Sequence, residues 1–245
     1  MTPPSDRSTV PQMISYPKSG KTWLRYAFKI AGVQCLTTHA GYGSNTKSKN
    51  FGRTFSGLSN LPTVNRGILL IRDPIDTAVS LYFQIQLRDM PDTGLVRTAR
   101  LVLGRRIPPK DLVTFLRHPG FGVKRVCQFN RAWIDHVGSD SRFIIVKYEL
   151  IRRSPDVEYK RILDHIAPGR GFDIEKIVRE TSFEVMRKVE ESTNDQSLML
   201  GAKGKDDQSR KVRRGKIKGY VDYLDATQRS EFEKIRDEFN LTESA

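Results

Sequence analysis

The sequence predicts a single α/β domain with a central parallel sheet flanked by helices. Segments typical of strands alternate with segments typical of helices, an order that favours parallel strands joined by helical crossovers. The run at 67–72, Gly-Ile-Leu-Leu-Ile-Arg, is apolar almost throughout, as expected of a parallel strand covered on both faces. With 245 residues, 38% of them apolar and 29% charged, the chain has the composition of a folded globular domain.

The N-terminal half begins with a predicted strand, a tight loop and a helix. Residues 12–16 suit a short strand, and the Pro-Lys-Ser-Gly turn at 17–20 follows it. The next stretch is amphipathic, with four apolar side chains on one helical face: Leu24, Ala27, Phe28 and Ala31. A second strand is predicted over 33–38.

Helices and one more strand are predicted after the strand at 67–72. Asp73 and Pro74 supply an N-cap and a first-turn proline for a helix to about Arg88. The remaining elements are expected as helices near 110–118 and 123–137, a strand over 142–148, a helix from Ser154-Pro155 to about Ile166, and a last helix opened by a capping box of Asp225 and Gln228.

The rest of the chain is expected to form a tail and two long loops. Residues 1–11 contain three prolines and suit a flexible tail, which leaves 12–245 as the domain. Residues 41–66 and 192–219 are polar, show little periodicity, and are long enough to suggest functional loops. The longest aliphatic run has four residues, and no stretch suits a signal peptide. We therefore expect no membrane span and a cytoplasmic location.

The positive charge is concentrated in two segments. The formal net charge is +14, of which residues 97–131 contribute +8 and residues 203–218 contribute +6, so the remainder is balanced. These segments favour an anionic partner such as a nucleic acid, a glycan or a charged small molecule. Cys35 and Cys127 are too few for a disulfide framework, and no His, Cys and Asp cluster has metal-ligand spacing. No metal is expected.

The segment Tyr16-Pro-Lys-Ser-Gly-Lys-Thr-Trp23 lies between a predicted strand and a predicted helix. Backbone N–H groups at such a helix start, together with nearby lysines, are suited to holding a phosphate or sulfate. The end of the segment is similar to a Walker A motif, but Ser15 stands where that motif has its first glycine. An ordinary surface turn is the alternative for this segment taken alone.

The chain resembles the sulfotransferases that use 3′-phosphoadenosine 5′-phosphosulfate (PAPS). Its first octet differs from their YPKSGTTW loop only at Lys21, where those enzymes usually have threonine. Arg72, at the end of a strand, is followed eight residues later by Ser80, as in the family's 3′-phosphate segment. The five segments that carry the resemblance, in family order, are Tyr16–Trp23, Leu69–Tyr82, Val146–Glu149, Thr181–Met186 and Arg213–Gly215.

The resemblance implies a P-loop NTPase-like sulfotransferase fold and transfer of a sulfuryl group from PAPS to an acceptor hydroxyl. It implies that the 5′-phosphosulfate is held by Lys18, Ser19, Gly20, Lys21 and Thr22. The implied 3′-phosphate ligands are Arg72, Ser80, Arg213, Arg214 and Gly215. The adenine would contact Trp23, Phe183, Tyr148 and Thr181. Catalysis would then rest on positioning and on cationic side chains, of which Lys18 reaches the leaving oxygen.

The general base is expected to be His39. In cytosolic members of the family a histidine ends the second strand in a KTH context, and Thr37-Thr38-His39 occupies that place here. A neutral imidazole accepts a proton near pH 7. A carboxylate, as in glycan-directed relatives, stays open as the alternative. His118, His136 and His165 lie in charge-rich helical segments and are expected at the surface.

Two further functions and the identity of the acceptor stay open. The Gly20-Lys21-Thr22 tripeptide would also suit a small-molecule kinase, and the basic segment 97–131 a nucleic-acid-binding protein. That segment has little aromatic interleaving, which disfavours nucleic acid. Basic residues in 41–66 favour a glycan or another anionic hydroxyl acceptor over a steroid or simple phenol.

The family's KxxxTVxxxE dimer motif is not matched, because its positions hold Val221, Asp225, Ala226 and Ser230. We also expect the basic stretch 203–218 to be a lid over the donor.

Overall fold

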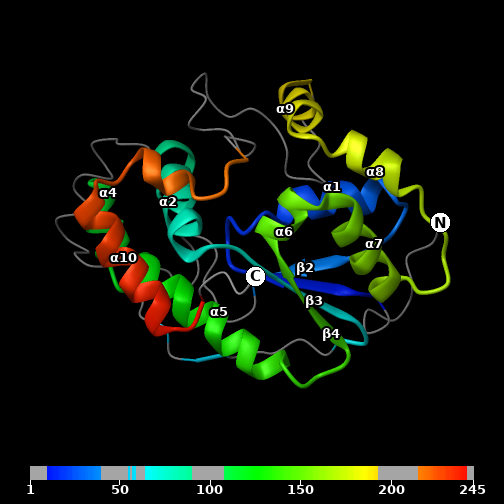
Figure 1. Ribbon diagram of the computed structural model, residues 1–245, viewed down its shortest axis with the longest axis horizontal. Helices are drawn as coiled ribbons and strands as arrows, with labels where there is room; N and C mark the ends of the chain where they lie inside the picture. Colours follow the sequence, from blue (N-terminus) through cyan, green and yellow to red (C-terminus); the bar gives the residue numbers. More distant parts are fainter. Residues whose placement is uncertain are drawn as a thin grey trace.

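A four-stranded parallel sheet lies at the centre of the molecule (Figure 1). The computed structural model describes residues 10–39, 55, 57–58, 64–89, 108–192 and 215–241. The strands are β1 (Gln12–Ser15), β2 (Leu36–Thr38), β3 (Gly67–Ile71) and β4 (Phe143–Lys147), and their order is β2-β1-β3-β4. All pairs are parallel. The predicted α/β class with a central parallel sheet is confirmed.

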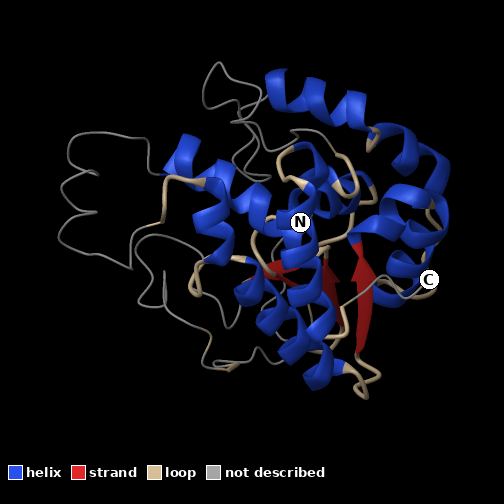
Figure 2. Ribbon diagram, turned by 60° about the vertical axis from the view of Figure 1, so that its left-hand side comes forward, coloured by secondary structure: helices blue, strands red, loops and turns tan. Residues whose placement is uncertain are grey.

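Helices cover both faces of the sheet, so that the strands are enclosed (Figure 2). On one face Met13, Ile68, Leu70 and Val146 pack in a core with the helices that follow β1 and β4. These helices are α1 (Lys21–Ile30), α6 (Tyr148–Arg153), α7 (Pro155–Ile166), α8 (Ile174–Glu180) and α9 (Phe183–Ser192). On the other face Ile14, Leu69 and Ile71 form the second core. The elements there are α2 (Pro74–Gln84), η1 (Ile85–Asp89), α4 (Leu112–Arg117), α5 (Val123–Val137), η4 (Gly219–Asp222) and α10 (Ala226–Glu238). Alternate residues of each buried strand thus serve opposite cores, which explains the continuous apolar run in β3.

Some predicted elements have different bounds in the structure. The second strand begins at Leu36 rather than residue 33. Val33 still belongs to the turn that ends α1, because its N–H donates to the Phe28 carbonyl at 2.9 Å. The helix after Asp73 is α-helical only to Gln84 and continues as the π-helical turn η1. The capping box of Asp225 and Gln228 is present as predicted.

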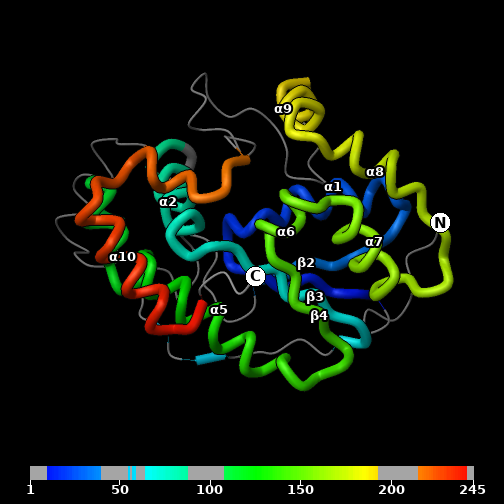
Figure 3. The backbone as a smooth tube through the Cα atoms, in the orientation of Figure 1, coloured from blue at the N-terminus to red at the C-terminus, as the bar shows by residue number. Residues whose placement is uncertain are grey.

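The C-terminal segment runs beside α2, as the backbone tube in Figure 3 shows. Arg236 of α10 forms an ion pair with Asp73, the N-cap of α2, at 3.1 Å. The Tyr220 N–H of η4 donates to Asp76 of α2 at 2.9 Å. These contacts fix residues 215–241 against the helix that begins at the end of β3. Within the described residues, no helix combines the length and the apolar character needed to cross a membrane.

Candidate functional site

The predicted site residues gather at the carboxyl ends of β1, β3 and β4. The strand order changes direction at β1, since the chain passes from β1 to β2 on one side and then to β3 on the other. Ligands of open α/β sheets bind in the crevice at such a switch point. The register pairs Ser15 with Leu70 and Ile71 with Lys147. The loop after β1, Arg72 and Tyr148 therefore follow directly on paired positions and lie together.

The loop 16–20 has the backbone shape of an anion site. Lys18 has a φ of +73° and Gly20 a φ of +98°, both in the left-handed region. The helix α1 that follows has neither a side-chain cap nor an acidic residue in its first turn, so the positive end of its dipole is uncompensated by side chains. A Cβ at Gly20 would lie 2.5 Å from the Tyr148 ring. Glycine is thus required there by both its φ and its contact with Tyr148.

Several buried polar atoms in and next to this loop lack hydrogen-bond partners among the described residues. Two of them are Oγ of Ser19, whose residue is 1% exposed, and Nε of Arg72. A buried hydroxyl or guanidinium N–H without a partner is costly in free energy and is uncommon in native proteins. Both atoms are donors at the place where the sequence predicts phosphate groups. They fit a bound anion.

Arg72 is held from several sides. Its Nη1 donates to the Lys18 carbonyl at 3.3 Å, and its Nη2 lies 3.6 Å from the Asp76 carboxylate. The guanidinium carbon also lies 4.6 Å from the centre of the Tyr148 ring. Burial raises the pKa of Asp76 to about 6, although Arg72 acts in the opposite direction. Ser80 lies one turn beyond Asp76 on the same helix and is partly buried.

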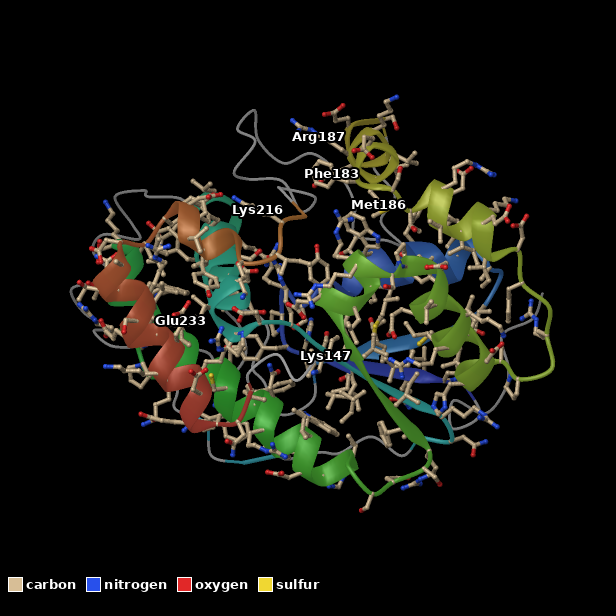
Figure 4. All side chains as sticks on the ribbon, in the orientation of Figure 1. Lys147, Phe183, Met186, Arg187, Lys216 and Glu233 are labelled. Carbon is tan, nitrogen blue, oxygen red and sulfur yellow. The ribbon has the colours of Figure 1, made fainter. Side chains whose placement is uncertain are left out.

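The segment 215–218 closes the site on the side of α2. Arg72 Nη2 donates to the Lys216 carbonyl at 3.5 Å, and Arg152 Nε donates to the Gly215 carbonyl at 3.1 Å. Gly215 has a φ of +60°, and a Cβ there would lie 2.8 Å from the Phe183 ring. Figure 4 shows Phe183 at the start of α9 and Lys216 across from it.

Trp23 and Phe183 form an aromatic pair next to this segment. Their ring centres are 6.5 Å apart and their planes differ by 22°, near the outer limit of aromatic contacts. The Arg152 guanidinium lies 4.9 Å from the Trp23 ring centre. The Thr181 hydroxyl donates to the Ile177 carbonyl at 2.7 Å, so it binds a carbonyl in the last turn of α8, of which Thr181 is the C-cap.

His39 lies beside the first residue of α1. The parallel pairing of Ile14 with Thr38 brings His39 level with Ser15, and His39 Nδ1 is 2.5 Å from the Ser15 carbonyl oxygen. Its Nε2 is 2.6 Å from Nζ of Lys21. Burial, and then the Lys21 charge, lower the pKa of His39 to about 4. The ring is therefore neutral at pH 7, as a general base must be.

Several predicted residues lie outside the described residues or differ from expectation. Arg213, Arg214 and most of the predicted lid 203–218 are outside them, as is most of the basic segment 41–66. Of the three other histidines only His136 is exposed. His118 and His165 are partly buried: Nδ1 of His118 accepts from the Gly120 N–H at 3.0 Å, and Nε2 of His165 lies 3.2 Å from the Gly67 carbonyl oxygen. Among the described residues, no three His, Cys, Asp or Glu side chains are grouped as metal ligands.

Two residues of this site were not predicted from the sequence. Asp76 joins Arg72 to η4, and Arg152 joins Trp23 to Gly215. Asp76 stands four residues after Arg72, a spacing that pairs charges on a helix. The spacing could be seen in the sequence, but the rule applies within a helix, and Arg72 precedes α2. No comparable sequence signal marks Arg152, which is one of two adjacent arginines at the end of α6.

Comparisons with known proteins agree with this arrangement. A sequence model described as the sulfotransferase domain matches residues 59–241. The structure is similar to that of mouse sulfotransferase SULT7A1 crystallised with PAP, with a TM-score of 0.65 and 18% identity over 98% of this chain and 87% of that one. It is also similar to retinol dehydratase crystallised with androsterone and the inactive cofactor PAP, with a TM-score of 0.66 and 16% identity over 98% of this chain and 83% of that one. No curated protein matches the sequence significantly.

The chain belongs to the sulfotransferase domain family, because the family's sequence model covers well over half of it. This confirms the resemblance drawn from the five motifs, and with it the predicted class of enzyme, a sulfotransferase. The similarity in structure confirms the predicted fold.

Proposed function

We propose that this sulfotransferase transfers a sulfuryl group from PAPS to the hydroxyl of an anionic acceptor, such as a glycan. The observation that carries the donor assignment is a pair of buried donor atoms, Ser19 Oγ in the loop 16–20 and Arg72 Nε at the end of β3, that have no hydrogen-bond partner among the described residues. The solved relatives crystallised with PAP, the product left when PAPS loses its sulfuryl group, support the same donor.

The donor would lie along the carboxyl edge of the sheet. The 5′-phosphosulfate takes the loop and the start of α1, where Ser19, Gly20, Lys21 and Thr22 surround it and Lys18 reaches the leaving oxygen. The 3′-phosphate takes the side of Arg72, Ser80 and Gly215, with Arg213 and Arg214 as further ligands. A guanidinium suits this position because its fork pairs with two phosphate oxygens.

The adenine would lie against the aromatic pair. Trp23 and Phe183 have nearly parallel planes at a wide spacing, which suits contact with a flat base. Tyr148 and Thr181 flank the same region, since Tyr148 borders Gly20 and Thr181 lies two residues before Phe183. Residues 203–218 are proposed to cover the donor from the other side.

His39 would remove the acceptor proton. The acceptor oxygen forms a bond to sulfur while the bond from sulfur to the bridging oxygen breaks, and that electron pair stays on the 5′-phosphate. The hydroxyl proton passes to Nε2 of His39, since Nδ1 is used by the Ser15 carbonyl. Lys18 and the positive end of α1 stabilise the charge that builds on the leaving phosphate.

The acceptor assignment rests on the charge of the segments outside the sheet. Residues 41–66 contain Lys47, Lys49, Arg53 and Arg66 and no acidic residue, and 97–131 is strongly basic. Such an excess of positive charge attracts an acceptor that carries its own negative charge. An acceptor screen with labelled PAPS, comparing sulfated or carboxylated glycans with neutral phenols and steroids, tests this part. Faster transfer to the neutral phenols or steroids would overturn it.

The donor assignment is tested by thermal unfolding with two nucleotides. PAP should raise the melting temperature much more than AMP, because only PAP carries the 3′-phosphate that Arg72 recognises. Equal shifts would contradict the assignment. Turnover of ATP with magnesium, without any PAP binding, would favour the kinase alternative instead.

Arg72→Ala should weaken PAP binding by about 30-fold, equivalent to about 2 kcal/mol for a lost charged partner. The matched control is Arg117→Ala, which removes an exposed arginine that pairs with Glu231 on the surface. The control should leave PAP affinity unchanged, because surface ion pairs contribute little and Arg117 belongs to α4. Equal PAP affinity of both variants would place the 3′-phosphate elsewhere.

A further inference from the structure

Lys21 is the one residue that departs from the family octet, and the structure gives it a specific partner. It is the first residue of α1, and its Nζ lies 2.6 Å from Nε2 of His39. The other ring nitrogen, Nδ1, lies 2.5 Å from the Ser15 carbonyl oxygen. A carbonyl oxygen only accepts hydrogen bonds, so Nδ1 carries the ring proton and donates. Nε2 is therefore the acceptor, and the Lys21 ammonium donates to it.

This contact occupies the lone pair that a general base needs. A hydroxyl proton cannot reach Nε2 while the Lys21 ammonium is bound there, since a neutral imidazole has one acceptor nitrogen. Burial and the Lys21 charge also lower the pKa of His39 to about 4, which weakens it as a base. In the arrangement that the structure describes, Lys21 thus opposes the role expected of His39.

Lys21 also stands where an anion would attract it. It follows Gly20 directly, at a helix start that has no acidic residue and no side-chain cap. A phosphate held by the backbone of this loop would lie within reach of a four-carbon side chain on its first helical residue. An anionic oxygen attracts the Lys21 ammonium by its charge as well as by a hydrogen bond, whereas the neutral Nε2 of His39 offers a hydrogen bond alone, so the phosphate would compete with His39.

We propose that Lys21 is a donor-sensitive cap on His39. It covers Nε2 in the arrangement described here and moves to the anionic 5′ group when the donor binds, so that Nε2 becomes available to the acceptor only after donor binding. The inference rests on the proposed function in two respects, namely that His39 is the base and that an anionic donor occupies the loop.

The cap makes a prediction about the titration of His39. Burial is the largest cause of the lowered pKa of His39 and the charge of Lys21 from α1 is the next, whereas the hydrogen bond from Nδ1 to the Ser15 carbonyl of β1 acts in the opposite direction. Removal of the Lys21 charge from Nε2 therefore raises the pKa of His39 towards its ordinary value of 6.5. Replacement of Lys21 by threonine and binding of an anion that attracts Lys21 should act in the same direction.

The experiment is an NMR titration of the full chain labelled with ¹⁵N at the histidine rings, with the His39 signal assigned by a His39→Gln variant. PAP should raise the His39 midpoint by about one pH unit or more in the wild-type chain. Lys21→Thr should raise the midpoint to a similar extent without PAP, and PAP should then add little. Lys29→Thr is the matched control, because it removes an exposed lysine at the other end of α1.

The outcomes separate the cap from the proposed function. The same His39 midpoint in Lys21→Thr and in the wild type, both without nucleotide, would overturn the cap. If PAP binds and leaves the wild-type midpoint unchanged, the exchange of Lys21 is wrong. If PAP does not bind, the donor assignment fails, and the nucleotide-free comparison alone still decides whether Lys21 controls His39. A shift in the Lys29→Thr control equal to that in Lys21→Thr would also overturn the cap.

Discussion

Asp76 is a buried carboxylate whose negative charge lowers the free energy of unfolding when it is ionised. It is 3% exposed, faces Arg72 at 3.6 Å and accepts a hydrogen bond from the Tyr220 N–H. Its Oδ2 has no hydrogen bond within the described part of the chain. We predict that Asp76→Asn changes the pH dependence of stability, because asparagine imitates the protonated carboxyl and keeps an oxygen for Tyr220.

The magnitude follows from the pKa of Asp76, which burial raises from 3.8 to about 6. A pKa that is higher in the folded state contributes stability at low pH, below the unfolded value, and this contribution is lost as the pH rises through the folded value. At about 1.4 kcal/mol per pH unit, the full loss is about 3 kcal/mol. About 2 kcal/mol of it falls between pH 4 and pH 7.

The assay is urea unfolding of the wild type and the variant at a series of pH values. The free energy of unfolding of the wild type should fall relative to that of Asp76→Asn by about 2 kcal/mol between pH 4 and pH 7. Asp164→Asn, which removes a carboxylate from an exposed ion pair on α7, is the control for the change in net charge. A difference between wild type and Asp76→Asn that is independent of pH, or equal to that of the control, would refute the reasoning.

Three further substitutions test other parts of the site. Gly20→Ala should destabilise the chain by about 3 kcal/mol, against about 1 kcal/mol for Gly169→Ala, as measured by urea unfolding; both have positive φ, but only Gly20 meets a ring. Equal losses would mean that the contact with Tyr148 is unimportant. Arg152→Ala should lower stability by about 1–2 kcal/mol and weaken PAP binding in a calorimetric titration, and unchanged values for both would contradict its bridging role. Arg72→Lys should keep the charge and still lose about tenfold in PAP affinity relative to AMP, since lysine lacks the fork; retention of full selectivity would show that charge alone suffices.

The local parts of the site could be predicted from the sequence because each is encoded within a few neighbouring residues. The strand, loop and helix from Gln12 to Ile30 combine an apolar run, a glycine and an amphipathic stretch. Arg72 follows an apolar strand directly, and Asp73 and Pro74 mark the next helix. The parallel class of the sheet then brings the ends of these strands together without further information.

Contacts that depend on the register between strands could not be predicted in the same way. The contact of Lys21 with His39 exists because Ile14 pairs with Thr38, which sets His39 beside Ser15. A shift of one residue would turn His39 to the other face of the sheet. The helices α8 and α9 were not predicted either. The helix α8 has seven residues and a single buried one, Ile177, so its periodic signal is weak, whereas α9 is amphipathic and could have been predicted.

Arg72 and Lys21 are both cations at the site, but the structure holds them differently. Arg72 is fixed by two carbonyls, a carboxylate and an aromatic ring, so it needs little reorganisation when an anion binds. Donors fixed in this way stabilise charge most effectively, since the cost of ordering them is met during folding. Lys21 instead meets the uncharged Nε2 of His39, a partner that an anionic oxygen can replace. A fixed cation is suited to recognising the donor, whereas a cation with an exchangeable partner is suited to reporting to the base that the donor has bound.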